Sequence, residues 1–165
     1  MKKLLMVGGT MGVGKTTTCQ MLKRRLPNSV FLDGDWCWDM HPFQPTDETR
    51  AMVVENSCFL LNQFLRCSAY EHVIFCWVMH EQQILETLLG GLQLEGCRVF
   101  AFSLLCRPDI LAQRLQRDVA SGLRSQGLIG RSLARLPLYE RLDTQKVDVS
   151  HLTPEEAAAR ILAQL

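Results

Sequence analysis

Short apolar runs alternate with longer amphipathic segments along the whole chain, and this alternation predicts the secondary structure. Five apolar runs predict buried strands at residues 3–7, 29–32, 73–78, 98–105 and 146–149. Segments with helical spacing predict helices at residues 17–26, 46–67, 81–89 and 131–141. Helix-start signals predict two further helices, which begin at residues 108 and 153. Strands that alternate with helices predict an α/β fold, in which helices cover both faces of a parallel sheet.

Helix-start signals support several of these boundaries. Thr46 precedes two acidic residues at the start of the long helix, and Pro108 suits a first helical turn. Thr153 followed by Glu156 has the spacing of a capping box. A glycine-containing segment at residues 121–130 interrupts the helical pattern. No repeat, low-complexity tract or linker divides the chain, so we expect one domain over residues 1–165.

The most informative motif lies between the first strand and the first helix. It fits the phosphate-binding pattern G-x-x-x-x-G-K-[ST] and reads Gly9, Thr10, Met11, Gly12, Val13, Gly14, Lys15, Thr16. In a strand-to-helix turn of this kind, backbone N–H groups surround the α- and β-phosphates of a nucleotide, and the helix start adds a positive dipole end. Lys15 would contact the β- and γ-phosphates, Thr16 would ligate Mg²⁺, and Thr17 extends the binding segment. The motif predicts binding of ATP with Mg²⁺.

Two carboxylates one residue apart follow the second strand, at Asp33 and Asp35. Beside a phosphate loop, Asp33 could hold Mg²⁺ through water, and Asp35 could accept a proton from an attacking hydroxyl. The alternative is an Asp-Gly turn with solvated carboxylates. The third strand ends without an aspartate, which leaves the metal-supporting role to Asp33 and makes Glu81 a weaker candidate.

Aromatic and polar residues near the predicted carboxyl edge of the sheet suggest a pocket for a phosphoryl acceptor. Trp36 and Trp38 follow the acidic pair, whereas Trp77 is expected in the core. His80 could contact the substrate or be satisfied at the strand end, and Arg50 could bind the substrate or lie on the surface. The predicted substrate-contacting residues are Asp35, Trp36, Trp38, Arg50 and His80.

Arginine dominates the basic residues in the last third of the chain. Arg114 and Arg117 are one helical turn apart, as are Arg131 and Arg135, so each pair shares a helical face. A guanidinium group binds phosphate oxygens in a bidentate manner. We expect the segment between the two pairs to be a lid over the triphosphate, with phosphate contacts made by Arg117, Arg124 and Arg131. The predicted catalytic residues are Lys15, Asp33, Asp35, Arg117, Arg124 and Arg131.

The bulk composition narrows the partners and the location. The chain has 165 residues, of which 47% are apolar and 21% charged, and its formal net charge is +1. This balance gives no reason to expect nucleic-acid or membrane binding. The seven cysteines form no C-x-x-C pair, and no signal peptide precedes the first strand. We expect a cytoplasmic protein, a monomer or a homodimer, without disulfides or zinc.

The phosphate loop, the acidic pair after the second strand and the arginine-bearing lid together resemble the small P-loop kinases. This group includes shikimate kinase, gluconate kinase, nucleoside monophosphate kinases and phosphotransferases of the chloramphenicol type. The resemblance implies a three-layer α/β/α fold with the strand order 2-3-1-4-5, and a lid at about residues 118–130. It also implies that Asp33 serves the metal, that Asp35 serves the acceptor hydroxyl, and that Arg117 or Arg124 contacts the transferred phosphate. The glycine-rich substrate loop of shikimate kinases is absent after the third strand.

These features predict an ATP-dependent kinase that acts on a small molecule, such as a nucleoside, a nucleotide or an antibiotic. The first alternative is a nucleotide-dependent switch or accessory ATPase whose bound state a protein partner reads. A nucleic-acid end kinase is a second alternative, which the near-neutral charge disfavours. The identity of the acceptor and the choice between ATP and GTP stay open at this point.

Overall fold

The computed structural model describes residues 1–165, and five parallel strands form a single sheet in the order β2-β3-β1-β4-β5. This order and the three-layer α/β/α class confirm the prediction. The strands are β1 (Lys2–Gly8), β2 (Ser29–Asp33), β3 (His72–Trp77), β4 (Cys97–Leu105) and β5 (Gln145–Asp148).

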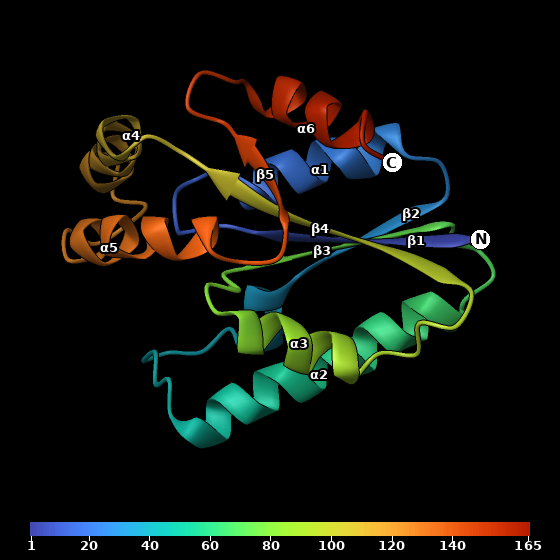
Figure 1. Cartoon of the computed structure of the whole chain (residues 1–165). Helices are drawn as coiled ribbons and strands as arrows, with labels where there is room; N and C mark the ends of the chain where they lie inside the picture. Colours follow the sequence, from blue (N-terminus) through green and yellow to red (C-terminus); the bar gives the residue numbers. More distant parts are fainter.

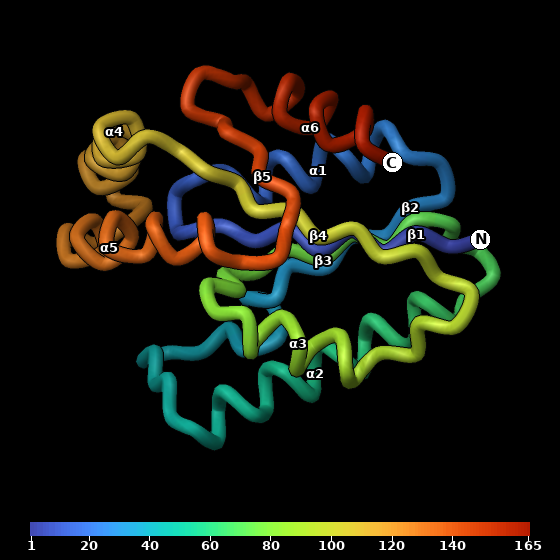
Figure 2. Tube along the Cα trace, in the orientation of Figure 1, coloured from blue at the N-terminus to red at the C-terminus, as the bar shows by residue number.

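Helices cover both faces of this sheet. They are α1 (Lys15–Arg25), the 3₁₀ helix η1 (Gly34–Cys37), α2 (Asp47–Arg66), α3 (Gln82–Gly90), α4 (Pro108–Ala120), α5 (Leu128–Glu140) and α6 (Pro154–Leu162). Figure 1 shows α1 and α6 on one face, α2 and α3 on the other, and α4 and α5 beyond the end of the sheet that is opposite the two termini. The trace in Figure 2 shows β1 and β4 running from the N-terminal side of the molecule toward α4 and α5.

Two hydrophobic cores hold the layers together. Every residue of β3 is buried, as expected for a central strand that is covered on both faces. Alternate side chains of the strands enter opposite cores: Leu5 and Ile74 pack beneath α1 and α6, whereas Met6 and Phe75 pack against α2 and α3. This alternation fixes the register, because a slip of one residue would exchange the two sets of side chains.

Two helix starts differ from the sequence prediction, and one short helix was not predicted. Helix α1 begins at Lys15 instead of residue 17, so Lys15 and Thr16 lie in its first turn. The interruption expected over residues 121–130 covers only residues 121–127, because α5 already begins at Leu128. The short η1 helix was not predicted; the Asp33 side chain caps it by accepting a hydrogen bond from the backbone of Asp35.

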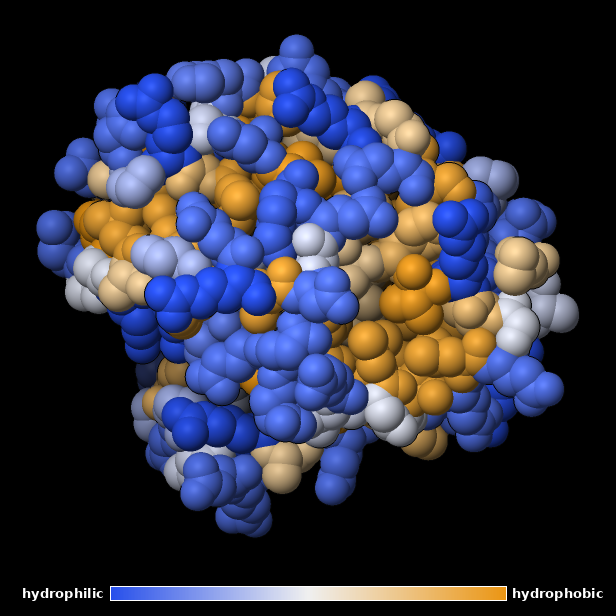
Figure 3. All heavy atoms as spheres, in the orientation of Figure 1, coloured by the Kyte–Doolittle hydropathy of each residue, from blue (hydrophilic) through white to orange (hydrophobic).

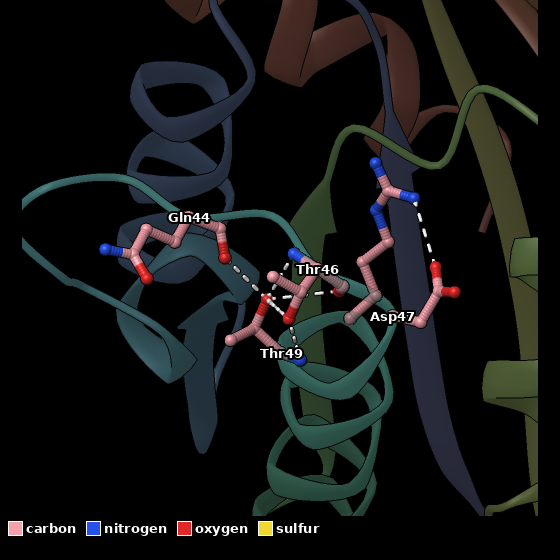
Figure 4. A network of polar contacts seen from close by, with 5 residues as sticks. Gln44, Thr46, Asp47 and Thr49 are labelled. Atoms are coloured by element: carbon pink, nitrogen blue, oxygen red, sulfur yellow. Dashed lines mark hydrogen bonds and ion pairs between the residues drawn. The ribbon is translucent and has the colours of Figure 1, made fainter.

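The predicted capping box of α6 is confirmed, and α2 has a second capping box that was not predicted. At α6, Thr153 and Glu156 form a reciprocal capping box. At α2, Thr46 and Thr49 form the equivalent pair, and Figure 4 shows the resulting network of polar contacts. The Thr49 hydroxyl also donates to the carbonyl of Gln44 at 2.7 Å, which fixes the chain entering α2.

The first half of β4 has no strand on its outer side, because β5 pairs only with Phe102 to Leu105. In Figure 3 a hydrophobic area lies on the right of the view, over the region where Figure 1 places α3 and this half of β4. No helix of the protein combines the length with the apolar character needed to cross a membrane.

Candidate active site

The phosphate loop joins β1 to α1, as predicted, and its glycines are required by its shape. Gly12 and Gly14 have positive φ values of 82° and 104°, in the left-handed region that favours glycine. A Cβ atom on Gly12 would also lie 2.4 Å from Cδ2 of Leu115. Gly14 is the N-cap of α1 and has no capping side chain, so the first N–H groups of the helix stay available. This is the arrangement of an anion-binding helix N-terminus.

Lys15 lies at the centre of the loop. Its Nζ donates a hydrogen bond to the carbonyl of Thr10 at 3.1 Å. Burial lowers the pKa of its ammonium group, whereas the nearby Asp35 and Asp33 carboxylates raise it and the Arg124 guanidinium lowers it further. Because burial makes an ammonium group without a counter-charge unfavourable, the loop is suited to a polyanion.

A buried contact that sequence reasoning missed fixes the loop to α5. The hydroxyl of Thr10 donates to the carbonyl of Ser132 at 2.8 Å, and the hydroxyl of Ser132 donates to the carbonyl of Met11 at 2.5 Å. Thr10 and Ser132 are both fully buried. The two residues are more than a hundred positions apart, so no local pattern could have linked them. The contact couples the position of α5 to the shape of the loop.

The acidic pair lies directly beside the start of α1. Asp33 ends β2, is 5% exposed, and its Oδ2 accepts a hydrogen bond from the Thr16 hydroxyl at 2.7 Å. A hydroxyl and a carboxylate oxygen are ligands that Mg²⁺ accepts, together with water and phosphate oxygens. No cluster of three or more His, Cys, Asp or Glu side chains that could hold a metal ion is present. The residues therefore fit a cation that takes few protein ligands, as Mg²⁺ does when it is bound to a nucleotide.

Asp35 lies in η1 and is held by Trp77. The indole Nε1 of Trp77 donates to Oδ1 of Asp35 at 3.1 Å. Trp77 was expected to be a core residue, and its 8% exposure agrees, but it also orients a polar side chain at the sheet edge. Gly34 makes this possible: a Cβ there would lie 2.5 Å from Cγ of Trp77. Since Trp77 fixes Oδ1, the second oxygen of Asp35 can accept a bond from a substrate hydroxyl.

The structure brings together only two of the three tryptophans. Trp38 packs edge-to-face on Trp77, with ring centroids 5.8 Å apart, and on Phe43 at 5.1 Å. Trp36 instead packs on Phe31 at 5.3 Å and is 56% exposed. Trp38 therefore adjoins Asp35 and Trp77, whereas Trp36 belongs to the rim on the opposite side of the sheet.

The end of β3 places His80 among charged groups of two helices. Burial lowers the pKa of His80, the charges of Arg135 and Arg50 lower it further, and the Glu81 carboxylate raises it. Glu81 lies 3.4 Å from Nε2 of His80, so its carboxylate faces this ring. Arg50 is exposed, and its Nη1 lies 3.6 Å from Oδ1 of Asp47. His80 and Arg50, both predicted to contact substrate, thus lie near each other at one end of the sheet.

The predicted lid arginines differ in their surroundings. Arg124 donates to Asp118 at 2.9 Å, across the turn that joins α4 to α5. Arg117 and Arg131 are exposed and form no ion pair. Of these three arginines, only Arg124 contributes to the lowered pKa of Lys15. Arg114, to which no contact role was assigned, donates instead to the carbonyl of Val13 at 3.4 Å and to that of Val149 at 2.8 Å.

A pocket of about 250 Å³ lies behind the phosphate loop, on the α1 and α6 side of the sheet. Arg114 lines it, together with Gly14 and Thr17 of the loop segment and Val149 and Leu152 of the segment after β5. Sequence reasoning missed this pocket because its walls come from three distant parts of the chain. The pocket has mixed polar and apolar walls and lies beside the phosphate loop, and its volume is smaller than that of a typical drug-sized site.

Comparison with known families agrees with this geometry. Residues 5–136 match the family model described as an AAA domain, a match that includes the phosphate loop, the acidic pair and most of α5. The chain belongs to the AAA domain family. We find no match among curated proteins.

Three solved structures resemble this AAA domain protein over nearly its whole length. The tunicamycin resistance protein of Deinococcus radiodurans is 22% identical, with a TM-score of 0.75, and 99% of this chain and 95% of that chain are covered. A sugar kinase from Janibacter is 18% identical, with a TM-score of 0.71 and coverage of 99% and 94%. A gluconokinase from Sinorhizobium meliloti is 20% identical, with a TM-score of 0.67 and coverage of 98% and 90%. At these identities the likeness shows the fold, which is that of the small P-loop kinases.

Proposed function

We propose that this protein is an ATP-dependent kinase that transfers the γ-phosphoryl group to a hydroxyl of a small-molecule acceptor. The observation that carries the proposal is the 2.7 Å bond between Thr16 and Asp33, which joins the phosphate loop to the acidic pair. Phosphoryl transfer needs aligned reactants and neutralised charge more than it needs covalent catalysis. A donor site that adjoins a metal-binding carboxylate and a second carboxylate for the acceptor meets these needs.

On the donor side, the backbone of residues 9–17 and Lys15 would bind the phosphates of ATP. The pocket beside Arg114 would receive the base and ribose, because it opens at the start of α1. Thr16 and Asp33 would hold Mg²⁺, directly or through water, and the bound cation would supply charge neutralisation to the phosphates. The buried link between Thr10 and Ser132 would keep the loop in its binding shape.

On the acceptor side, Asp35 would orient the attacking hydroxyl and take its proton. Its Oδ1 is engaged by Trp77, so the other oxygen would face the substrate. Trp38 would form an apolar wall beside it, and Arg50 and His80 would lie farther along the rim. Trp36, which packs on Phe31 on the other side of the sheet, would lie outside this wall. A wall of this kind excludes water, which otherwise competes with the acceptor for the phosphoryl group.

We further propose that the whole chain acts as one kinase domain, with the region of residues 118–130 as its lid. Arg117, Arg124 and Arg131 lie in or beside this region, and on closure they would neutralise charge on the transferred phosphoryl group. The 2.9 Å pair between Arg124 and Asp118 would exchange for a phosphate contact at this step.

The test is a phosphoryl-transfer screen with three variants. The panel consists of nucleosides, nucleotides, sugar acids, aminoglycosides and chloramphenicol-type compounds. Lys15→Ala should abolish both MgATP binding and transfer. Asp35→Asn should abolish transfer but spare MgATP binding, measured by calorimetry. Asp39→Asn is the matched control, because Asp39 is exposed in the same segment, and it should transfer normally. Full turnover by Asp35→Asn, or ATP turnover stimulated only by a macromolecule, would refute the proposal.

A further inference from the structure

The outer edge of the sheet is open along the first half of β4. Because β5 pairs only with Phe102 to Leu105, residues 97–101 have β1 on one side and no strand on the other. In a parallel sheet the N–H and C=O groups of one residue point to the same side, and those of the next residue point to the opposite side. The carbonyl of Leu105 points outward, since it accepts a hydrogen bond from the N–H of Val149 at 2.8 Å. Every second residue back from Leu105 therefore directs its backbone groups to the open side.

Four backbone groups on this open edge have no partner within the protein. They are the carbonyl of Cys97, the N–H and the carbonyl of Val99, and the N–H of Ala101. The N–H of Cys97 differs, because it donates to the carbonyl of Leu94 at 3.0 Å. A row of unpaired donors and acceptors on a strand edge is a template for a further strand.

The open edge lacks the features that prevent such pairing in other proteins. Edge strands are protected by proline, by a bulge or by charged side chains. Residues 97–101 contain no proline, and they pair with β1 in an unbroken register. Their one charged residue, Arg98, has its guanidinium 4.6 Å from the centroid of the Phe100 ring on the same strand. This charge is therefore stacked along the strand.

The side chains around the open edge are mainly apolar. Cys97, Val99 and Ala101 lie on the face covered by α2 and α3, and each is only partly buried. Leu92 and Leu94, which precede β4, are also partly buried and pack against the same core. The hydrophobic area in Figure 3 lies over this part of the molecule. Apolar surface beside unpaired backbone groups is typical of a protein interface.

We propose that the open edge pairs with the same edge of a second copy of this chain, antiparallel and about a twofold axis at Val99. In this register the N–H and the carbonyl of Val99 bond the carbonyl and the N–H of the partner's Val99. The N–H of Ala101 donates to the carbonyl of the partner's Cys97, and the reciprocal bond forms as well. All four free groups of each copy are then paired.

Other twofold registers do not match the free groups. An axis at Cys97 would need the N–H of that residue, which the carbonyl of Leu94 already accepts. An axis at Ala101 would place Val99 opposite Ser103, which already pairs with β5. An axis at Arg98 or at the next even-numbered residue would oppose groups that point toward β1. The edge is thus complementary to itself in one register.

The side chains match in the same register. Val99 faces the partner's Val99, and Cys97 faces the partner's Ala101, so apolar groups meet on the face covered by α2 and α3. On the other face Arg98 lies opposite the partner's Phe100, where a guanidinium and an aromatic ring attract each other. This match favours a second copy over an unrelated strand as the occupant of the edge.

Pairing of the two edges would join two sheets into one and leave both candidate active sites open. The open edge belongs to the amino-terminal half of β4, whereas the phosphate loop lies at the carboxyl end of β1, which runs parallel to β4. In an antiparallel pair the two carboxyl ends point in opposite directions. The inference goes beyond the proposed kinase function and does not depend on it.

The first test measures self-association by sedimentation velocity. Between about 1 µM and about 200 µM the wild type should change from monomer to dimer. Val99→Pro removes the N–H at the twofold axis and keeps the ladder to β1, because this N–H points outward. Arg98→Glu changes an exposed side chain and places a carboxylate opposite the ring of the partner's Phe100. Each variant should weaken dimerisation roughly tenfold to hundredfold. Cooperative melting at the lowest concentration shows that both variants fold.

The control for the first test lies on another apolar part of the surface. Phe59 on α2 is 62% exposed, and Phe59→Glu should dimerise as the wild type does. A wild type that stays monomeric at the highest concentration would overturn the proposal. Dissociation of the dimer by Phe59→Glu, with no effect of Val99→Pro, would place the interface on α2 and would also overturn it.

The second test measures amide hydrogen exchange by NMR at a low and a high protein concentration. Exchange at Val99 and Ala101 should slow at the high concentration, because these two outward N–H groups gain partners only in the dimer. Exchange at Arg98 and Phe100, which face β1, and at Cys97, which bonds a carbonyl of its own chain, should be slow at both concentrations. A dimer in which Val99 and Ala101 exchange as fast as in the monomer would show that the edges do not pair.

Discussion

Replacement of Gly34 by alanine tests whether Trp77 positions Asp35. A Cβ at residue 34 would lie 2.5 Å from Cγ, 2.7 Å from Cδ1 and 2.9 Å from Cβ of Trp77. Gly34 is not in the left-handed region, so the substitution adds steric conflict without backbone strain. Trp77 cannot move outward freely, because it is buried and packs against Trp38. The indole must therefore shift and lose its bond to Asp35.

Two magnitudes follow from this geometry. Overpacking of a buried side chain costs about 1–3 kcal/mol in the free energy of unfolding. For a domain of this size each kcal/mol lowers Tm by roughly 2–4 °C, so we expect Tm to fall by about 2–12 °C. A hydrogen bond to a charged group is worth about 1.5–3 kcal/mol, so acceptor-dependent kcat should fall by roughly tenfold to hundredfold. The affinity for MgATP should not change, because the three atoms nearest to the added Cβ all belong to Trp77.

Scanning calorimetry and acceptor-dependent turnover measure the two effects. Gly90→Ala is the control, since a Cβ there would meet nothing within 4 Å. Trp77→Phe tests the hydrogen bond without overpacking. It removes the N–H donor and leaves a smaller aromatic ring beside Trp38, so turnover should fall, whereas any fall in Tm comes from the lost ring volume. If Gly34→Ala melts with the control and retains its turnover, the positioning role of Trp77 is wrong.

Three further predictions concern other parts of the structure. Gly12→Ala should weaken MgATP binding at least tenfold in calorimetry, because its Cβ would lie 2.4 Å from Leu115 at a φ of 82°; wild-type affinity would contradict this. Ser132→Ala should lower the free energy of unfolding in urea by about 1–3 kcal/mol, since a partly buried carbonyl of the phosphate loop loses its donor; an unchanged midpoint would argue against the link. Hydrogen bonds from the Ser150 hydroxyl and backbone lower the pKa of Asp148. The ionised carboxylate stabilises the folded protein above its unfolded pKa of about 4, and this stabilisation is lost as the pH falls. Ser150→Ala should therefore show a smaller fall in Tm than the wild type between about pH 6 and pH 2. If Tm of the variant and of the wild type fall in parallel, this linkage is ruled out.

The phosphate loop and the acidic pair could be predicted from sequence because their geometry is local. The two loop glycines adopt a conformation that other residues resist, and the strand and helix that the loop joins are its immediate neighbours. Asp33 ends a strand beside β3, and parallel strands bring their carboxyl ends to one edge. Thr16 and Asp33 could therefore both be assigned to the metal from the sequence, whereas the hydrogen bond between them was not predicted.

Other parts of the candidate site depend on packing between distant segments. The roles of Trp77, Ser132 and Arg114 arise from hydrogen bonds to residues 35 to 122 positions away, and no spacing in the chain encodes such a partner. The separation of Trp36 from Trp38 likewise follows from η1, a short helix that depends on the buried Asp33 cap.

The sequence by itself determined the class of fold, the order of its elements and a loop suited to polyphosphate, because hydrophobic periodicity and glycine conformation act over a few residues. Only the tertiary structure decided which arginines pair with a carboxylate of the protein and which do not. That distinction depends on burial and on partners contributed by other helices. The sequence does not distinguish Arg124 from Arg135. In the structure Arg124 pairs with Asp118 across the turn between α4 and α5, whereas Arg135 has no carboxylate partner.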